Sequence, residues 1–352
     1  MARGLQSEEQ VTESQGSSPT VSVVMPTYNR GHLLPPVVES ILSQDFQDLE
    51  LVIVDDGSTD DTAAVVRQIQ TRDPRVRYVP LPENRGVGFA RDAGLRYAPG
   101  KYIALADSDD IWLPGRLREQ VEILERHPEI DILFGDFWNI DHLHGTKHRA
   151  FERSPTLRQV VARPIEDGLF LIQRGMDIEI LKSNFIATPT MVLRRQVFDR
   201  VGGFVPYLKS PDLDFCWRAA VLGARYAYLD RPLIERHVYS DSLTAQGGQP
   251  YLDQLEALDV MGQTCWRLGR QDLLPHIHAA KVQTYRALLR IYGGNRQRAQ
   301  VTCTFIKSLR CGVSVRTLVW FLAALLGPWA LASVETVAKM RGNLTTPSAP
   351  RE

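Results

Sequence analysis

Residues 49–61 read LELVIVDDGSTDD, an apolar run that ends in paired carboxylates and a glycine turn. Comparable apolar runs are VSVVM at 21–25, VRYV at 76–79 and YIALA at 102–106. Helix-compatible stretches lie between these runs, at 33–44, 60–72 and 86–97. Because short strands alternate with helices, the pattern predicts βαβ units and a mainly parallel sheet.

The runs at 21–25 and 51–54 are apolar and β-branched along almost their whole length. Strands of this kind are buried on both faces, so we expect them at the centre of a sheet that helices cover on both sides. The expected fold class is α/β, with a Rossmann-like sheet that is mixed but mainly parallel. A helical C-terminal region should follow, because Leu, Ala, Gln and Arg dominate beyond about residue 250.

The composition is that of an ordinary globular protein. The chain has 352 residues, 44% of them apolar, which is enough for one large domain and a smaller appendage. Lys plus Arg (41) balances Asp plus Glu (41), so we expect no nucleic-acid partner. The four cysteines form no C-x-x-C pair, and no apolar signal segment follows the N-terminal charges, which favours a cytoplasmic location.

The pattern divides the chain into a polar, disordered arm at 1–18, an α/β domain at 19–240, a helical region at 241–341 and a flexible tail at 342–352. The middle of the α/β domain, from about 128 to 235, is less regular than its beginning. Within it we expect strands at 132–134 and 187–193 and a helix at 212–222.

Polar residues follow three of the apolar runs: PTYNR at 26–30, DDGSTD at 55–60 and DSDD at 107–110. In open α/β sheets, ligands bind beyond the carboxyl ends of the strands, so these places are the first candidates for a site. The last of them holds three carboxylates that repel one another unless a cation compensates. Mg²⁺ or Mn²⁺ held by Asp107 and Asp109 together with a diphosphate meets that need. The alternative is a solvated turn in which Asp110 caps a helix that begins near Pro114.

The turn at 55–58 also has two interpretations. Asp and Ser before a helix are common caps, and Gly57 supplies an unusual backbone angle. A carboxylate can equally accept a hydrogen bond from a uracil ring N–H, while backbone donors near 26–27 bind the other edge of the base. One member of the Asp55-Asp56 pair can cap while the other faces a ligand.

Residues 20–117 closely resemble the GT-A domain of glycosyltransferase family 2. The resemblance rests on four blocks in the right order and spacing: SVVMPTYNR, ELVIVDDGSTDDT, ENRGVGFARDAG and GKYIALADSDDIWLP. A weaker resemblance continues to about residue 240 through TMV at 190–192, VGGF at 201–204 and PDLDFCWR at 211–218.

The resemblance implies a nucleotide-sugar transferase that inverts the anomeric configuration with the help of Mn²⁺ or Mg²⁺. Thr27 and Asp56 would hold the base, Arg91 would lie near the nucleotide, and Asp107 would contact the ribose or the metal. The nucleotide-binding residues that it implies are Pro26, Thr27, Tyr28, Asp56, Arg91 and Asp107, and the metal ligands are Asp109, Asp107 and His237. His237 has an alternative role as a structural hydrogen-bonding residue.

The sequence departs from the family pattern in two places. Asp92 stands where an Asn is usual, and Pro211 stands where a Glu usually precedes the helix Asp. This leaves Asp212 as the candidate general base, which inversion needs because the acceptor hydroxyl must lose its proton, with Asp214 a lesser candidate. The alternative for Asp212 is a helix cap or first-turn carboxylate that the helix dipole stabilises.

Two further motifs carry less chemistry. His142, His144 and His148 are too loosely spaced for zinc, so we expect an exposed loop near the acceptor. Gly86-x-Gly88 lacks the third glycine of a dinucleotide fingerprint, which argues against a nicotinamide enzyme.

Residues 317–334 carry no charge and are almost wholly apolar around Gly327-Pro328. As a helix they would reach about 27 Å, slightly short of the roughly 30 Å hydrocarbon core. Lys307, Arg310 and Arg316 precede the segment and Lys339 and Arg341 follow it, as expected for a segment that lies on an anionic membrane surface. The alternative is a buried helix packed on the helical region.

The resemblance therefore implies a transferase that moves a sugar from a nucleoside diphosphate sugar, with UDP favoured, to a saccharide or lipid-linked saccharide acceptor in cell-surface polysaccharide synthesis. We expect it to lie peripherally on the inner face of the membrane through 317–334. The main alternative is a catalytically silent nucleotide-binding scaffold at the membrane. A nucleotidyltransferase would need a Gly-rich basic loop after the first strand, where this chain has Thr27-Tyr28-Asn29-Arg30.

Overall fold

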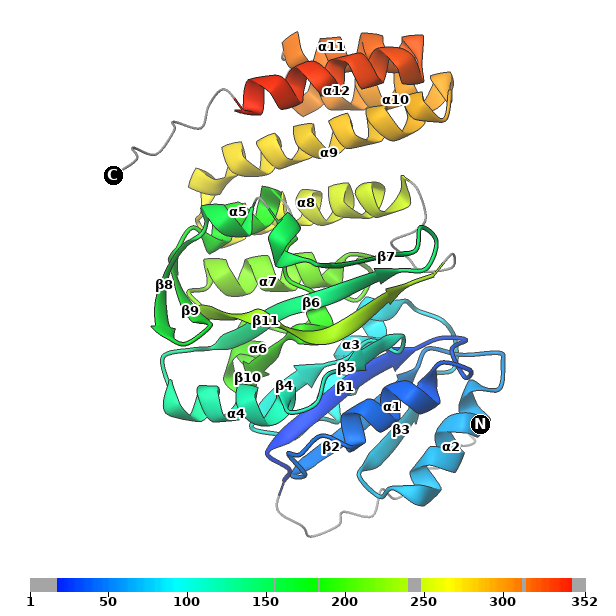
Figure 1. The fold of residues 1–352 in the computed structure, drawn as a ribbon, viewed down its shortest axis with the longest axis vertical. Coiled ribbons are helices and arrows are strands. Elements are labelled where there is room, and N and C mark those ends of the chain that lie inside the picture. The colour runs from blue at the N-terminus through cyan, green and yellow to red at the C-terminus, as the bar shows by residue number, and fades with distance from the viewer. Residues whose placement is uncertain (1–17, 155, 183, 240–247, 312–314, 344–352) are drawn as a thin grey trace, which may run out of the picture.

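The computed structural model describes residues 18–154, 156–182, 184–239, 248–311 and 315–343. One sheet runs through the α/β part in the order β3-β2-β1-β4-β10-β6-β11-β9-β8, and β5 and β7 pair with β11 and β6 at its side. A stack of helices from α8 to α12 occupies the end of the molecule away from α1 and α2 (Figure 1). The expected class, an α/β sheet followed by a helical region, is confirmed.

The first half of the sheet is parallel. It contains β1 (Val21–Thr27), β2 (Leu49–Asp55), β3 (Val76–Pro80) and β4 (Tyr102–Leu105). The connecting helices are α1 (Leu34–Leu42), α2 (Thr62–Arg72) and α3 (Val87–Arg96). Every residue of β1 is buried, as its apolar sequence predicts for a central strand.

The second half of the sheet is mixed. Its strands are β5 (Asp110–Trp112), β6 (Ile132–Asp141), β7 (Thr146–Arg149), β8 (Val161–Glu166), β9 (Leu169–Arg174), β10 (Val192–Arg194) and β11 (Tyr226–Val238). β10 is antiparallel to both β4 and β6, whereas β6 and β11 are parallel. The short β10 thus joins the two halves.

Helices cover both faces of the sheet. Successive strand residues point to opposite faces, so each buried strand contributes apolar side chains to both helical layers. Val21, Val23 and Met25 pack with α1 and with α4 (Arg116–Arg126), whereas Val24 packs on the other side. That other side is covered by α3, α5 (Met176–Lys182), α6 (Arg195–Val201) and α7 (Pro211–Val221). Here α3 lies so close that a Cβ on Gly94 would come within 2.7 Å of Val24 and Val54.

The C-terminal helices are α8 (Gln249–Arg267), α9 (Leu274–Gly294), α10 (Arg298–Ser308), α11 (Val315–Leu326) and α12 (Pro328–Asn343). Short 3-10 helices occur in both parts of the chain. They are η1 (Phe151–Arg153), η2 (Leu157–Gln159) and η3 (Thr188–Thr190) in the α/β part, and η5 (Gln271–Leu273) and η6 (Leu309–Cys311) in the helical region. Helix α8 packs on α7 and α9, so its apolar residues join the same core as α7.

Several expected elements differ in the structure. The strand expected at 187–193 begins only at Val192, because η3, which contains Pro189, occupies 188–190. Asp110 does not cap a helix: it lies in β5, and α4 begins at Arg116 after Gly115 in a left-handed conformation. The arm at 1–18, except Ser18, the boundary near 240 and the tail beyond Asn343 lie outside the described residues.

The apolar segment 317–334 is divided between two helices. The break lies at Gly327, whose φ of 99° favours glycine, followed by Pro328 at the start of α12. Among the helices that the structure describes, none combines the length and the apolar character needed to cross a membrane.

Candidate active site

The carboxyl ends of β1 and β2 meet at one edge of the sheet. Thr27 lies opposite Asp55 in the register, and the backbone N–H of Asp56 donates to the Thr27 carbonyl at 2.8 Å. The hydroxyl of Thr27 is buried and has no hydrogen-bond partner among the described residues, whereas Tyr28 is exposed. Pro26 pairs with Val54 immediately before this edge. The strand ends thus present the residues at 26–28 as the spacing predicts.

The turn after β2 is closed by side chains of the chain itself. Asp55 accepts hydrogen bonds from the Ser58 N–H at 2.9 Å and from the Tyr78 hydroxyl at 2.7 Å. Asn29, with a φ of 51°, accepts the Thr59 N–H at 2.8 Å and so links the β1 and β2 turns. Of the Asp55-Asp56 pair, Asp55 is therefore the member that closes the turn. Tyr78 was not identified from the sequence.

Asp56 is the second carboxylate of the pair and faces the loop before α3. Its two oxygens accept the backbone N–H groups of Arg85 at 2.9 Å and Gly86 at 2.7 Å. Burial raises the pKa of this carboxyl, and the two N–H donors partly offset the rise. A carboxylate offers about four lone-pair sites, so Asp56 retains capacity for a further donor such as a ring N–H.

Arg91 and Asp107 form an ion pair at the end of β4. Arg91 is 5% exposed on α3, and its Nη2 lies 2.5 Å from Asp107 Oδ1. The Nε of Arg91 is buried without a partner among the described residues. Asp107 itself remains about one third exposed. The structure thus joins two residues that the family resemblance places beside the nucleotide, although 16 positions separate them in sequence.

Asp109 and Asp110 add negative charge next to Asp107. Burial, and then the charge of Asp107, raise the pKa of Asp109 to about 6, and Arg30 and Arg236 oppose the rise. Burial and the same neighbouring carboxylates also raise the pKa of Asp110 well above its ordinary value. Mutual repulsion therefore disfavours the ionised forms of these carboxylates, and a bound cation would favour them.

His237 contacts this cluster through its backbone N–H, and its imidazole ring contacts His142 instead. Its N–H donates to Asp110 Oδ1 at 3.3 Å, and its Nδ1 lies 2.8 Å from His142 Nε2. The rings of His142, His237 and Tyr239 are stacked, with centroids 4.6 to 6.1 Å apart. The Nε2 of His237 is buried without a partner in the described part of the chain, and burial lowers its pKa, which keeps the imidazole neutral. His142 and His144 lie in the exposed β6–β7 turn, as expected, whereas His148 lies in β7 and is half-buried, so it does not belong to the expected exposed loop.

The metal ligands expected from the sequence are only partly assembled. Within the described ranges, no group of three or more His, Cys, Asp or Glu side chains is arranged to hold a metal ion, so Asp107, Asp109 and His237 do not form such a group. A divalent cation bound through a diphosphate needs only one or two carboxylates from the protein, because phosphate oxygens and water supply the other ligands. The partly buried Asp109, with its raised pKa, fits that smaller demand beside Asp107.

Asp212 lies in a second part of the site, on the first turn of α7. Ser210 precedes the helix and Pro211 occupies its first position, so Asp212 is not the cap. Its Oδ2 accepts the Asn184 side-chain amide at 2.9 Å and the Thr188 hydroxyl at 3.4 Å. Neither partner was identified from the sequence. No hydrogen bond reaches Oδ1 within the described residues, so this oxygen can accept a proton from a ligand.

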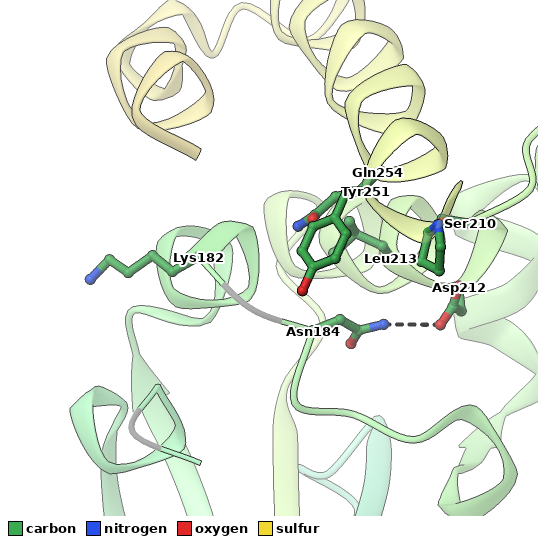
Figure 2. A pocket seen from close by; sticks show the side chains of 8 residues that line it. Lys182, Asn184, Ser210, Asp212, Leu213, Tyr251 and Gln254 are labelled. Atoms are coloured by element: carbon green, nitrogen blue, oxygen red, sulfur yellow. Dashed lines mark hydrogen bonds between the residues drawn. The ribbon is translucent and has the colours of Figure 1, made fainter. Parts of the chain in front are cut away.

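Asp212 lines a pocket of about 270 Å³ between the α/β part and the helical region (Figure 2). The other lining residues are Lys182, Asn184, Ser210, Leu213, Pro250, Tyr251 and Gln254. Figure 2 shows that Tyr251 and Gln254 come from α8 and that the hydroxyl end of Tyr251 points toward Asn184. The helical region thus contributes directly to the wall of this pocket.

Asp214 has a different environment, although it lies only two residues after Asp212. It is fully buried, and its Oδ2 lies 2.7 Å from the Arg218 guanidinium. Arg218 in turn donates to the carbonyls of Val201 and Gly203. The sequence left Asp214 as a lesser candidate for the base, but its position identifies it as an internal anchor for the loop at 201–203.

The strand-end cluster and the Asp212 pocket are joined through short links. Leu105, two residues before Asp107, donates to the Met191 carbonyl at 3.3 Å, and Met191 directly follows η3, which contains Thr188. At the start of α3, a Cβ on Gly88 would lie 3.1 Å from the Cβ of Pro211. The elements that position Asp107, β4 and α3, thus contact the segments that position Asp212, η3 with its following residue and α7.

Comparison with known proteins places this arrangement in a family. The family model "Glycosyl transferase family 2" matches residues 22–202, slightly more than half of the chain. The glycosyltransferase GlyG of Streptococcus pneumoniae is 35% identical over 184 residues, which cover 52% of this chain and 60% of GlyG. The GalNAc(5)-diNAcBac-PP-undecaprenol beta-1,3-glucosyltransferase of Campylobacter jejuni is 42% identical over 101 residues, 28% of this chain and 32% of that protein. The matches therefore span less than two thirds of these two relatives.

Solved structures agree on the fold. S. aureus TarS 1-349 in complex with UDP-GlcNAc matches with a TM-score of 0.55 at 18% identity, covering 90% of this chain and 83% of that one. The mannosyltransferase PcManGT from Pyrobaculum calidifontis, in complex with GDP-Man and Mn²⁺, matches with a TM-score of 0.52 at 20% identity, covering 90% and 86%. At these identities the likeness concerns the fold alone. Since the family model covers the strand-end residues and most of the sheet, the chain belongs to glycosyl transferase family 2.

Proposed function

We propose that this protein transfers a sugar from a nucleoside diphosphate sugar to a saccharide or lipid-linked saccharide acceptor, with inversion at the anomeric carbon. The observation that carries the proposal is the linkage of two half-sites: the acidic cluster beside Arg91 at the end of β4, and the Asp212 pocket at the start of α7. The first suits a nucleotide diphosphate and the second suits an acceptor hydroxyl. The transferase domain corresponds to residues 19–240, and 241–341 form the attached helical region.

The donor nucleotide lies against the strand ends. The base contacts the turn at 26–28, where the Thr27 hydroxyl has no partner among the described residues, and Asp56, which retains lone pairs for a ring N–H. Arg91 holds Asp107 in place beside the ribose. We favour UDP as the nucleotide, the choice that the TarS complex illustrates for that protein.

Asp107 and Asp109 are the residues that would hold a divalent cation, Mn²⁺ or Mg²⁺, and the neutral, buried Nε2 of His237 is the third candidate ligand. Bound there, such an ion would neutralise the charge that develops on the leaving diphosphate. The protein supplies the fixed geometry: β4 and the ion pair with Arg91 hold Asp107 in place. PcManGT, a structure of the same fold, contains Mn²⁺.

Asp212 acts as the general base. Asn184 and Thr188 both donate to its Oδ2, which fixes the carboxylate and leaves Oδ1 to accept the proton of the acceptor hydroxyl. As that O–H bond breaks, the oxygen bonds to the anomeric carbon and the carbon–phosphate oxygen bond breaks on the opposite face. The result is one inversion without a covalent enzyme intermediate.

The acceptor is a saccharide or lipid-linked saccharide of cell-surface polysaccharide synthesis. The C. jejuni relative is named for an acceptor linked through pyrophosphate to undecaprenol, and such lipids are confined to membranes. We propose that the protein meets its acceptor in the cytoplasm at the inner face of the cell membrane, with 317–334 as the segment that attaches it.

The test is transfer from a panel of UDP- and GDP-sugars to a short saccharide acceptor, with product configuration read by NMR. Asp212→Asn should lower kcat at least about 10³-fold while nucleotide binding is retained, because it removes the base and leaves the strand ends intact. Asp199→Asn, on the exposed side of α6, is the matched control and should leave transfer unchanged. Nucleotide binding without transfer from any donor would favour a catalytically silent scaffold instead.

A further inference from the structure

Residues 273–334 contain no Asp or Glu, although acidic residues make up 41 of the 352 positions in the whole chain. The same segment carries eight basic residues: Lys281, Arg286, Arg290, Arg296, Arg298, Lys307, Arg310 and Arg316. It covers α9, α10, α11 and the start of α12, beyond the residues 22–202 that the family model matches. The neutral total of the chain therefore conceals a positively charged helical end.

The same helical end exposes large apolar side chains. Seven of the fifteen exposed large hydrophobic residues of the described chain lie between 306 and 329: Ile306, Leu309, Leu318, Val319, Leu322, Leu326 and Trp329. Each is at least 40% exposed, and Leu326 and Trp329 reach 80% and 85%. Single exposed apolar residues are ordinary on a protein surface, but a concentration of this kind marks an interaction site.

The fold explains why this face is left uncovered. Trp320, Ala323 and Ala324 of α11 are buried against Leu289 of α9 and Val301 of α10. The packing is close, because a Cβ on Gly293 would lie 2.7 Å from Ala324. The outward positions of α11 are 318, 319, 322 and 326, which lie on one side of a helix at 3.6 residues per turn. The break at Gly327 then begins α12, where Trp329 is also exposed.

Basic side chains interleave with these apolar ones. Lys307 adjoins Ile306, Arg310 adjoins Leu309, and Arg316 lies two residues before Leu318; all three basic residues are exposed. An apolar stripe flanked by Lys and Arg matches the two requirements of a bilayer surface, which are apolar depth for the stripe and anionic headgroups for its edges. A second copy of the same face would bring like charges together, so the charge favours a membrane over self-association.

Building on the membrane attachment proposed above, we infer that the exposed face of α10, η6, α11 and the start of α12 is a docking surface for an anionic lipid bilayer. The apolar residues at 318, 322, 326 and 329 enter the headgroup region, and Lys307, Arg310 and Arg316 contact lipid phosphates. No helix crosses the bilayer in this arrangement. Figure 1 shows α10, α11 and α12 at the end of the molecule away from α1 and α2, so docking through these helices leaves the strand-end site uncovered.

The experiment is flotation of the full-length protein with vesicles of phosphatidylcholine alone or of equal parts phosphatidylcholine and phosphatidylglycerol. The wild type should float with the anionic vesicles, bind neutral ones at least about tenfold more weakly, and dissociate as salt rises. Leu326→Glu should reduce binding to anionic vesicles at least about tenfold. Leu143→Glu, which changes an equally apolar exposed residue in the β6–β7 turn, should not.

A triple variant, Lys307→Gln with Arg310→Gln and Arg316→Gln, should lose the preference for anionic vesicles. Unchanged thermal unfolding of each variant shows that the fold is retained. Neither nucleotide binding nor sugar transfer is needed for the readout, so the result does not depend on the proposed activity. Failure of the wild type to float, or equal binding to both vesicle types, overturns the inference. A dimer in solution that Leu326→Glu abolishes, without vesicle binding, assigns the face to a second copy and also overturns it.

Discussion

At the scale of single residues, the carboxylates that follow the strands differ in their partners and hence in their roles. Asp55 closes its own turn, Asp56 holds the loop at 85–86, and Asp107 pairs with Arg91. For Asp109, burial and the charge of Asp107 disfavour the ionised form, and the charges of Arg30 and Arg236 only partly offset them. A cluster of like charges lowers the stability of the protein without a ligand, compared with a protein in which one of the charged groups is neutral. Such clusters are common at functional sites.

Asp109→Asn should stabilise the protein in the absence of nucleotide. The pKa of about 6 for Asp109 in the folded protein is higher than the pKa of the same carboxyl in the unfolded chain. Ionisation of Asp109 therefore disfavours the folded state above pH 6. It has no effect on stability at a pH where the carboxyl is protonated in both states. Allowing for the partial exposure of Asp109, the free energy of unfolding of the variant should be about 1 to 2 kcal/mol higher than that of the wild type near pH 8. The difference should vanish below about pH 4 in urea unfolding. An equal difference at both pH values would contradict the assignment.

At the scale of elements, two Asp–Arg pairs at i,i+4 spacing test how strongly burial changes the contribution of an ion pair to stability. Asp214 and Arg218 are buried in α7 and tie it to the loop at 201–203, whereas Arg96 of the Asp92–Arg96 pair in α3 is largely exposed. Arg218→Met should cost about 3 to 5 kcal/mol, because it leaves Asp214 charged and buried without its partner. Arg96→Met should cost less than about 0.5 kcal/mol. Chemical denaturation of the two variants checks this, and similar losses would refute the argument.

The packing of α3 against the sheet gives a second comparison. Gly94 has Val24 and Val54 within 2.7 Å of any added Cβ, whereas Gly262 in α8 has nothing within 4 Å. Gly94→Ala should therefore destabilise the fold by about 1 to 3 kcal/mol through overpacking. Gly262→Ala should stabilise it by about 0.5 to 1 kcal/mol, because alanine restricts the unfolded chain and favours helix. Thermal unfolding of both variants should shift in opposite directions; a shift of the same sign would show that the close approach is relieved elsewhere.

The elements that the sequence predicts well are those whose burial is local and two-sided. Strands β1, β2 and β4 and the helices between them follow from apolar runs and helical periodicity. The long β11 was not predicted, because its sequence YAYLDRPLIERHV mixes charged and apolar residues along a half-exposed strand. The partners of Asp212 were also missed. Asn184 lies between α5 and η3, and Thr188 begins η3, so both reach α7 only through the tertiary fold, which no local pattern reports.

At the scale of the whole molecule, the candidate functions follow one another along the chain and along the long axis in Figure 1. The parallel half of the sheet carries the residues that we propose bind the nucleotide, the junction with α8 forms the Asp212 pocket, and the terminal helices carry the exposed apolar and basic face. A transferase that acts on lipid-linked acceptors needs all three in one body. The sequence indicates the two ends of this arrangement, whereas the pocket at the junction requires the fold.

We expect the strand ends to bind a nucleotide together with a divalent cation. Calorimetric titration of UDP, GDP and dTDP, with and without Mn²⁺, tests it on the wild type, on Asp109→Ala and on the surface control Asp199→Ala. We predict that one nucleotide, UDP, binds only with the metal, that Asp109→Ala abolishes this binding, and that Asp199→Ala retains it. Absence of binding by any of the nucleotides under every condition would contradict the account.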